Sequence, residues 1–173
     1  MLLNLLFITF VSISGLSKPL EDLRKTFGSK KGFEVEFDQQ IKQDIFPDQP
    51  ETATGHVKFM RPHHLIWVYK TPHKRVIEYD GEVLRIDSEP VRDSGQVNLQ
   101  ESFSFLWGQP NSEIFSIETK NPSTFRVTPK NPSKAGFKFI DVSVKAGLVS
   151  NATVKNLLEG DSVLHFRNWK LQN

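Results

Sequence analysis

The sequence predicts an α+β fold in which a single domain is built on one curled antiparallel sheet and capped by a lid of short helices. Runs that alternate apolar and polar residues fill most of the chain, and this alternation is typical of strands. The run "LIWVY" is apolar on both faces, because Leu65, Trp67 and Tyr69 alternate with Ile66 and Val68. Two stretches of helical character interrupt the strands. A sheet that is apolar on both faces must be covered or must curl around its own contents.

The first seventeen residues, "MLLNLLFITFVSISGLS", contain no charged side chain and predict an export signal peptide. Their apolar run is shorter than the roughly 20 residues that cross a bilayer. Gly15 and Ser17 supply the small side chains that a signal peptidase needs before the cut, so we expect cleavage after Ser17. The absence of Lys and Arg from this segment keeps a retained anchor or a misassigned start as alternatives. Residues 18–173 are then expected to form one domain.

Composition narrows the class of partner. The net charge is +2, and the basic residues are scattered along the chain, so there is no electrostatic case for nucleic acid. The sequence has no cysteine, which predicts a fold that stands without disulfides. Phenylalanine occurs 14 times against two tyrosines, and this excess of bulky apolar groups suits an apolar interior or an apolar ligand.

The first half of the mature chain is predicted to be one helix followed by strands. In residues 18–28, Leu20, Leu23 and Phe27 recur at helical spacing, and Gly28 can end the helix. "GFEVEFDQQ" alternates apolar residues with carboxylates, which is typical of a strand with one wet face. "GHVKFMRPHHLIWVYKTP" predicts two further strands. In "HKRVIEYDGEVLRID" an Asp-Gly pair between two alternating runs predicts a hairpin.

The segment 96–117 changes character and is expected to contain one or two short helices instead of a strand. Its apolar cluster supplies the candidate lid residues Phe103, Phe105, Leu106 and Trp107. Strands resume with "STFRVTPK", "AGFKFIDVSVKAGLVSNATVKNL" and "DSVLHFRNWKLQN". The apolar phase of "FKFIDVSV" slips between Phe139 and Ile140, which predicts a β-bulge there.

The residue pattern favours no catalytic site, metal site or cofactor. His63 and His64 are adjacent, so on a strand they face opposite sides, and the other histidines have no ligand spacing that joins them. The "GDSV" that contains Ser162 is similar to a lipase serine motif. No downstream helix or histidine base can follow it in the order that such enzymes use, so we expect a turn before the last strand.

Arg61 and the inward apolar residues are the candidate binding site. Arg61 is either an exposed cation at a strand end or a latch whose guanidinium bonds a covering helix. The apolar residues form either a packed core or the wall of a cavity for an apolar ligand. The candidate cavity residues are Phe33, Val35, Phe37, Val57, Phe59, Leu65, Trp67, Tyr69, Phe125 and Val127.

The order of these features resembles the outer-membrane lipoprotein carrier family, LolA. "GHVKFMRPHHLIWVYKTPHKRVIEYDGEVLRI" is similar to that family's glycine-led strand, Arg-Pro turn, tryptophan-bearing strand, proline, and strand ending in Asp-Gly. "STFRVTPK" is similar to its later strand ending in Thr-Pro-Lys. The resemblance implies an unclosed β-barrel with a helical lid, and places Arg61 where the family's lid-binding arginine stands.

The resemblance also implies a function. It implies a monomeric periplasmic carrier, not an enzyme, that shields the acyl chains of lipoproteins. The implied partners are acylated lipoproteins, an inner-membrane lipoprotein-releasing ABC transporter and an outer-membrane acceptor. The alternative is an envelope-stress regulatory module of the same fold that senses lipid or lipoprotein and binds a protein partner.

Overall fold

The computed structural model describes residues 18–42, 50–91, 104–158 and 160–173. Residues 1–17, for which an export signal is predicted, lie outside the described residues, as does Phe103. The elements in chain order are α1 (Lys18–Phe27), β1 (Gly32–Lys42), β2 (Glu51–Met60), β3 (His64–Thr71), β4 (Arg75–Tyr79), β5 (Leu84–Ile86), β6 (Glu89–Pro90), η1 (Ser104–Trp107), β7 (Phe115–Asn121), β8 (Thr124–Pro129), α3 (Pro132–Ala135), β9 (Phe137–Lys145), β10 (Leu148–Asn156) and β11 (Asp161–Gln172).

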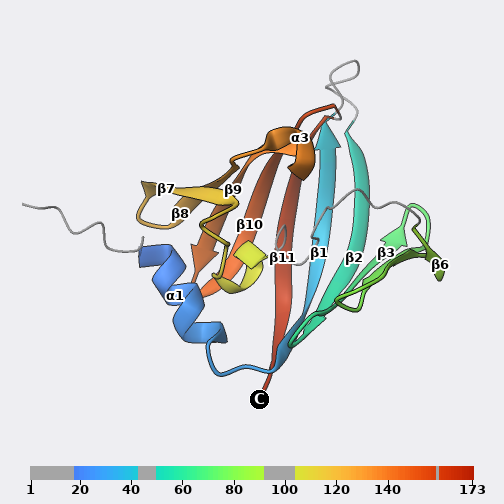
Figure 1. The fold of residues 1–173 in the computed structure, drawn as a ribbon, viewed down its shortest axis with the longest axis horizontal. Helices are drawn as coiled ribbons and strands as arrows, with labels where there is room; N and C mark the ends of the chain where they lie inside the picture. The colour runs from blue at the N-terminus through green and yellow to red at the C-terminus, as the bar shows by residue number, and fades with distance from the viewer. Residues whose placement is uncertain (1–17, 43–49, 92–103, 159) are drawn as a thin grey trace, which may run out of the picture.

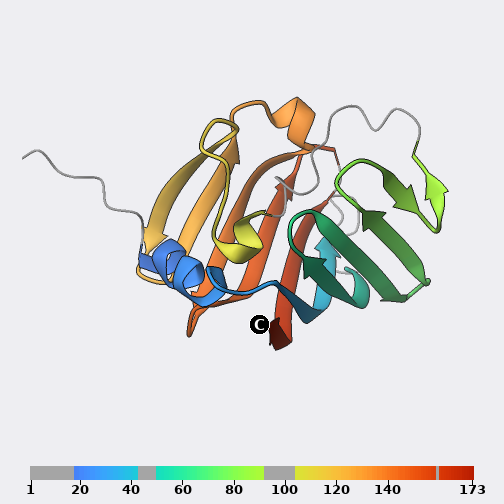
Figure 2. The same ribbon diagram turned by 60° about the horizontal axis from the view of Figure 1, so that its bottom comes forward.

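The strands form one antiparallel sheet of eleven members in the order β6-β5-β4-β3-β2-β1-β11-β10-β9-β8-β7. β6 and β7 are its two edges and do not pair with each other, so the curled sheet stays open (Figures 1 and 2). α1 contacts β8, β9, β10 and η1, while α3 contacts β8 and β9. The predicted fold class, α+β with an unclosed, curled antiparallel sheet and short helices, is confirmed.

The predicted N-terminal helix is confirmed as α1. Its inward stripe, Leu20, Leu23 and Phe27, is almost fully buried, because these residues recur on one face and pack against the sheet. The backbone amide of Gly28 donates to the Arg24 carbonyl at 2.8 Å, where the helix ends. Burial of this stripe fixes α1 over one side of the sheet.

Gly55 allows β2 to lie unusually close to its neighbours. Gly55 of β2 pairs with Phe37 of β1 and with Tyr69 of β3, and the β2–β3 register shifts beside it. A Cβ at this position would lie 1.9 Å from the Val68 carbonyl oxygen and 2.7 Å from the Phe37 ring. Only glycine lets the neighbouring backbone approach so closely, so β2 can bend here while the Phe37 ring covers the site.

The predicted Asp-Gly hairpin is confirmed between β4 and β5, where Tyr79 pairs with Leu84. Gly81 has φ +105, a conformation that favours glycine. The Asp80 carboxylate accepts from the backbone amides of Val83 at 2.8 Å and Glu82 at 3.0 Å, and from Arg85 Nη1 at 2.6 Å. The Val83 amide, the Arg85 guanidinium and the Glu82 amide together hold the pKa of Asp80 well below its usual range.

Two local predictions need correction. The helical prediction for 96–117 holds at the 3-10 helix η1, but β7 begins at Phe115, because this residue pairs with Pro129 of β8. The predicted bulge lies at Lys138 instead of between Phe139 and Ile140. Phe137 pairs with Asn156 while Phe139 pairs with Lys155, so Lys138 is the extra residue.

The outer face of β3 carries no covering element among those described. Ile66 and Val68 are half-buried there. Ile66 lies between Lys58 and Glu78 on the flanking strands, whose side chains shield part of its surface. α1 and η1 lie on the opposite, concave side of the sheet (Figures 1 and 2).

Candidate functional site

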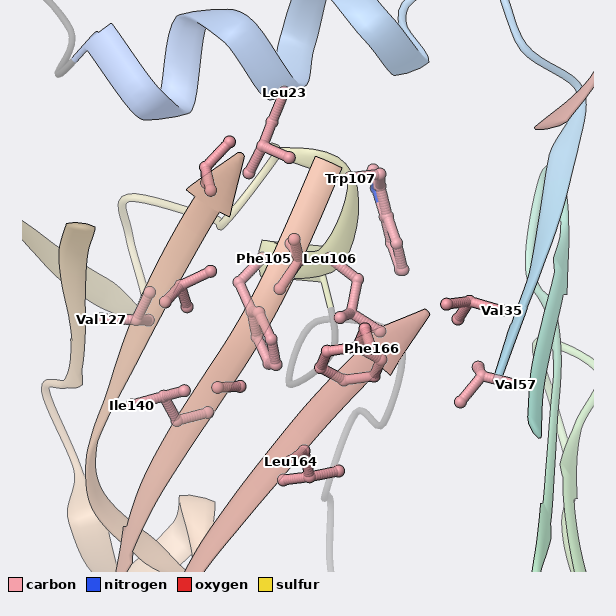
Figure 3. Close-up of a cluster of buried hydrophobic side chains, with 14 of the residues drawn as sticks. Leu23, Val35, Val57, Phe105, Leu106, Trp107, Val127, Ile140, Leu164 and Phe166 are labelled. Carbon is pink, nitrogen blue, oxygen red and sulfur yellow. The ribbon is translucent and has the colours of Figure 1, made fainter. Parts of the chain in front are cut away.

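An apolar cavity of about 690 Å³ lies on the concave side of the sheet, a size within the range of ligand pockets. Its apolar walls come from β1, β3, β4, β9, β10 and β11 and from α3 and η1. The apolar lining residues are Ile41, Leu65, Trp67, Tyr69, Ile77, Tyr79, Phe105, Ala135, Phe137, Ile140, Ala152, Val154, Leu164 and Phe166. Figure 3 shows part of this wall, with Phe105 of η1 and Ile140, Leu164 and Phe166 of the sheet.

The structure separates the ten candidate cavity residues into two groups. Leu65, Trp67 and Tyr69 line the cavity. The other seven pack in the buried core beside it: Phe33, Val35, Phe37, Val57, Phe59, Phe125 and Val127. The Phe37 ring lies 4.8 Å from the Trp67 ring between centroids, so the core supports the cavity wall directly.

The sequence reasoning missed polar and apolar wall residues that lie further along the same strands. On β1 the inward phase that contains Phe33 and Phe37 continues to Gln39 and Ile41, and both line the cavity. The signal was present, because Gln39 interrupts an otherwise apolar inward phase at its fourth position. The alternation of residues in β4 could likewise have predicted that Ile77 points into the cavity.

The lid consists of α1 and η1, the second of which reaches the cavity. Phe105, Leu106 and Trp107 are all buried, and Phe105 lines the cavity. Trp107 stacks on Phe59 of β2 with ring centroids 4.3 Å apart and planes at 9°. Figure 3 shows Leu23 pointing from α1 towards η1, above the side chains of Phe105 and Leu106. Both α1 and η1 therefore pack against the sheet.

α1 and η1 are joined to each other at Gly108. Arg24 Nε donates to the Gly108 carbonyl oxygen at 2.8 Å. Gly108 has φ +74, and a Cβ there would lie 2.8 Å from Leu23 Cβ and 3.0 Å from the Arg24 nitrogen. The close approach of the two segments thus depends on glycine at this position.

Arg61 lies at the C-terminal end of α1. Its Nη2 donates to the carbonyl oxygen of Phe27, the last residue of the helix, at 3.1 Å. Its backbone amide donates to the Lys31 carbonyl at 2.8 Å, which holds the Arg61 backbone beside the chain that leaves the helix. The last carbonyls of a helix have no partner within the helix and carry partial negative charge, so a guanidinium is well matched to this place.

We predict that Arg24→Met loosens the lid, because the hydrogen bond to Gly108 is lost while the aliphatic stem is kept. The free energy of unfolding should fall by about 1 kcal/mol. Amide hydrogen exchange across residues 104–109 should become faster. Lys25→Met, on the exposed side of the same helix, is the matched control and should change neither quantity. If amide hydrogen exchange in Arg24→Met is unchanged, the Arg24–Gly108 hydrogen bond does not hold η1 in place.

The described residues contain no group of three or more His, Asp or Glu side chains that could hold a metal ion. His64 Nε2 lies 2.8 Å from Glu78 Oε1, and His165 Nδ1 lies 2.7 Å from Asn151 Oδ1. The Ser162 hydroxyl stands at the start of β11 and accepts hydrogen bonds from two carboxamides. In the described parts of the chain, no helix is long and apolar enough to cross a membrane.

The matching family model and two relatives of similar sequence carry the same description. The family model described as outer membrane lipoprotein carrier protein LolA matches residues 29–173. The outer-membrane lipoprotein carrier protein of Vibrio vulnificus (strain YJ016) is 25% identical, with 96% of this chain and 86% of the relative covered. The protein of the same name from Coxiella burnetii (strain CbuK_Q154) is 24% identical, with coverage of 98% and 87%. The crystal structure of a LolA superfamily protein from Nitrosomonas europaea is 14% identical, with a TM-score of 0.47 and coverage of 91% and 94%.

Proposed function

The chain belongs to the outer membrane lipoprotein carrier protein family LolA, and from that membership we propose that it is a non-enzymatic carrier of lipoprotein acyl chains. The observation that supports this proposal most directly is the cavity of about 690 Å³ with apolar walls and a helical lid. Transfer of an acyl chain from water into such a site gains about 0.8 kcal/mol per CH₂ group. A carrier that moves acyl chains through water needs this kind of shelter.

A carrier must also release its cargo, and the lid offers a means. When the cavity is empty, contacts that hold α1 and η1 against the sheet stabilise the closed protein. Cargo that displaces any part of the lid must break some of these contacts, and each hydrogen bond is worth a net 0.5 to 1.5 kcal/mol or so. The affinity for acyl chains is limited by this competition, so that transfer to an acceptor remains possible.

The proposed route runs through the periplasm. An inner-membrane lipoprotein-releasing ABC transporter would supply the acylated protein, and an outer-membrane acceptor would receive it. The carrier would act as a monomer, since each chain has its own cavity and lid.

Export to the periplasm would depend on the uncharged leader. Removal of residues 1–17 gives a mature chain that begins at Lys18. N-terminal sequencing or the intact mass of protein from the periplasmic fraction should therefore identify Lys18 as the first residue. An intact leader on the periplasmic protein would contradict cleavage after Ser17.

Native mass spectrometry of protein purified from its own periplasm tests the proposed function. We expect a co-purifying acylated protein, together with acyl lipid in the organic extract. A bound regulatory protein and no acylated species would instead support the alternative, a regulatory module of the same fold. The two outcomes differ in mass and in lipid content, so one sample distinguishes them.

A further inference from the structure

A polar cluster interrupts the apolar wall of the cavity where β1, β10 and β11 lie side by side. It consists of Gln39, Asn156 and Ser162, all of which line the cavity. Register places Gln39 opposite Ala53 on β2, next to the point where Thr54 pairs with Thr71. The cluster therefore lies at the end of the sheet where β3 turns into β4. At this end the cavity is also lined by Thr71, His73, Lys74, Arg75 and Asp87, so the cluster lies between the apolar wall and a polar rim.

Hydrogen bonds within the cluster fix the orientation of the Gln39 carboxamide. Asn156 Nδ2 donates to the Gly160 carbonyl oxygen at 2.8 Å and to Ser162 Oγ at 3.4 Å. Ser162 is only 6% exposed, and its Oγ also accepts from Gln39 Nε2 at 3.3 Å. The amino group of the Gln39 carboxamide thus points to Ser162, which turns its oxygen the other way.

The oxygen turned away from Ser162 is an unsatisfied acceptor. Gln39 Oε1 is buried and has no hydrogen-bond partner among the described residues. A buried acceptor without a partner costs free energy, and native structures rarely keep one without a reason. A ligand that displaces the atoms covering this oxygen and brings its own donor would recover that cost.

The neighbouring walls indicate the kind of ligand that would bring the donor. Leu164 and Ala53 flank Gln39 on the inner faces of β11 and β2, so an acyl chain in the apolar part of the cavity passes beside the carboxamide. We propose that Gln39 Oε1 accepts a hydrogen bond from a neutral N–H or O–H group near the carbonyl end of a bound acyl chain. An amide-linked chain or a hydroxyacyl chain has such a group, whereas a plain ester has only acceptors. This inference rests on the proposed acyl-binding function and adds to it a preference for one class of acyl group.

The test compares three neutral dansyl probes that share a palmitoyl chain and a tether: an amide, an ester, and a β-hydroxypalmitoyl ester. Wild-type protein should bind the amide and the hydroxy ester about fivefold more tightly than the plain ester. A preference for the amide alone assigns the donor to the linkage, and a preference for the hydroxy ester alone assigns it to the chain. Either result supports the inference.

Gln39→Met keeps the length of the side chain and removes the acceptor, so the preference should disappear while ester affinity is kept or rises. Gln40→Met is the matched control, because Gln40 is the next residue on the exposed face of the same strand. It should keep the fivefold preference. Equal affinity of wild-type protein for all three probes would overturn the inference and leave the carrier function standing. Equal weakening of all three by Gln39→Met would also overturn it. No saturable binding of any probe would overturn both proposals.

Discussion

Trp67→Glu should lower the affinity for a fluorescent fatty-acyl probe by about 100-fold while the far-ultraviolet circular dichroism changes little. Trp67 lines the cavity, is 5% exposed, and packs its ring against Phe37. Loss of a large apolar surface and gain of a carboxylate that retains water both act against acyl burial. Two factors of ten in affinity correspond to about 2.8 kcal/mol. Titration of the probe into the folded variant measures the change in affinity.

The matched control is Ile66→Glu, one residue earlier on the same strand. Ile66 is half-buried on the outer face, between Lys58 and Glu78. The same added carboxylate should therefore leave probe affinity within about twofold of wild type, since it meets solvent. Tyr69→Glu provides a second cavity variant at a half-buried position, in case the tryptophan variant folds poorly. Equal binding by wild type and both cavity variants would place the acyl chain elsewhere.

The same inward alternation produces both core and cavity, and this limits what sequence can predict. Phe59 and Trp67 both point inward from neighbouring strands and are both buried. Phe59 lies under Trp107 of the lid, whereas Trp67 lies beside open space. Which of the two residues is covered depends on where η1 packs on the sheet. This is a long-range contact that no local sequence pattern predicts. Phe59→Glu would therefore disturb the packing of the lid instead of testing the cavity wall.

Local chemistry explains the elements that were predicted well. The hairpin at Asp80 and Gly81 follows from a side chain that accepts turn amides and a residue that adopts positive φ. The helix at α1 follows from the spacing of its apolar residues. The bulge was predicted at the wrong place because the slip in the apolar pattern can be produced by an extra residue at either Lys138 or Phe139. The Arg126 guanidinium lies 3.7 Å from the Phe139 ring centroid, so Phe139 takes the outward position.

A continuous series of contacts links Arg61 to the cavity. The guanidinium holds the end of α1 at Phe27, and Arg24 of the same helix bonds Gly108 after η1. η1 in turn places Phe105 in the cavity wall. An arginine at a strand end can therefore bias whether the lid stays closed, although it does not line the cavity itself. Coupling of this kind requires two arrangements of the lid, which a transfer assay can detect.

Arg61→Leu should load cargo normally and pass it poorly to the acceptor. The variant loses the bond to Phe27 that stabilises the closed empty protein, while the apolar cavity wall is unchanged. Because Arg61 is exposed, we expect the lower end of the range for a charged hydrogen bond, about 1.4 kcal/mol. The ratio of retained to delivered cargo would then rise about tenfold.

Two variants separate the latch from a general loss of positive charge. Arg61→Lys keeps the charge but has no planar fork, so its retention should lie between wild type and Arg61→Leu. Lys31→Leu removes a cation from the same exposed region, yet the backbone carbonyl that Arg61 bonds is kept. It should deliver cargo at the wild-type rate. Should Arg61→Leu also deliver at that rate, Arg61 is an ordinary strand-end cation, and the closed lid is held by other contacts, such as the buried apolar face of α1, the stacking of Trp107 on Phe59 and the Arg24 bond.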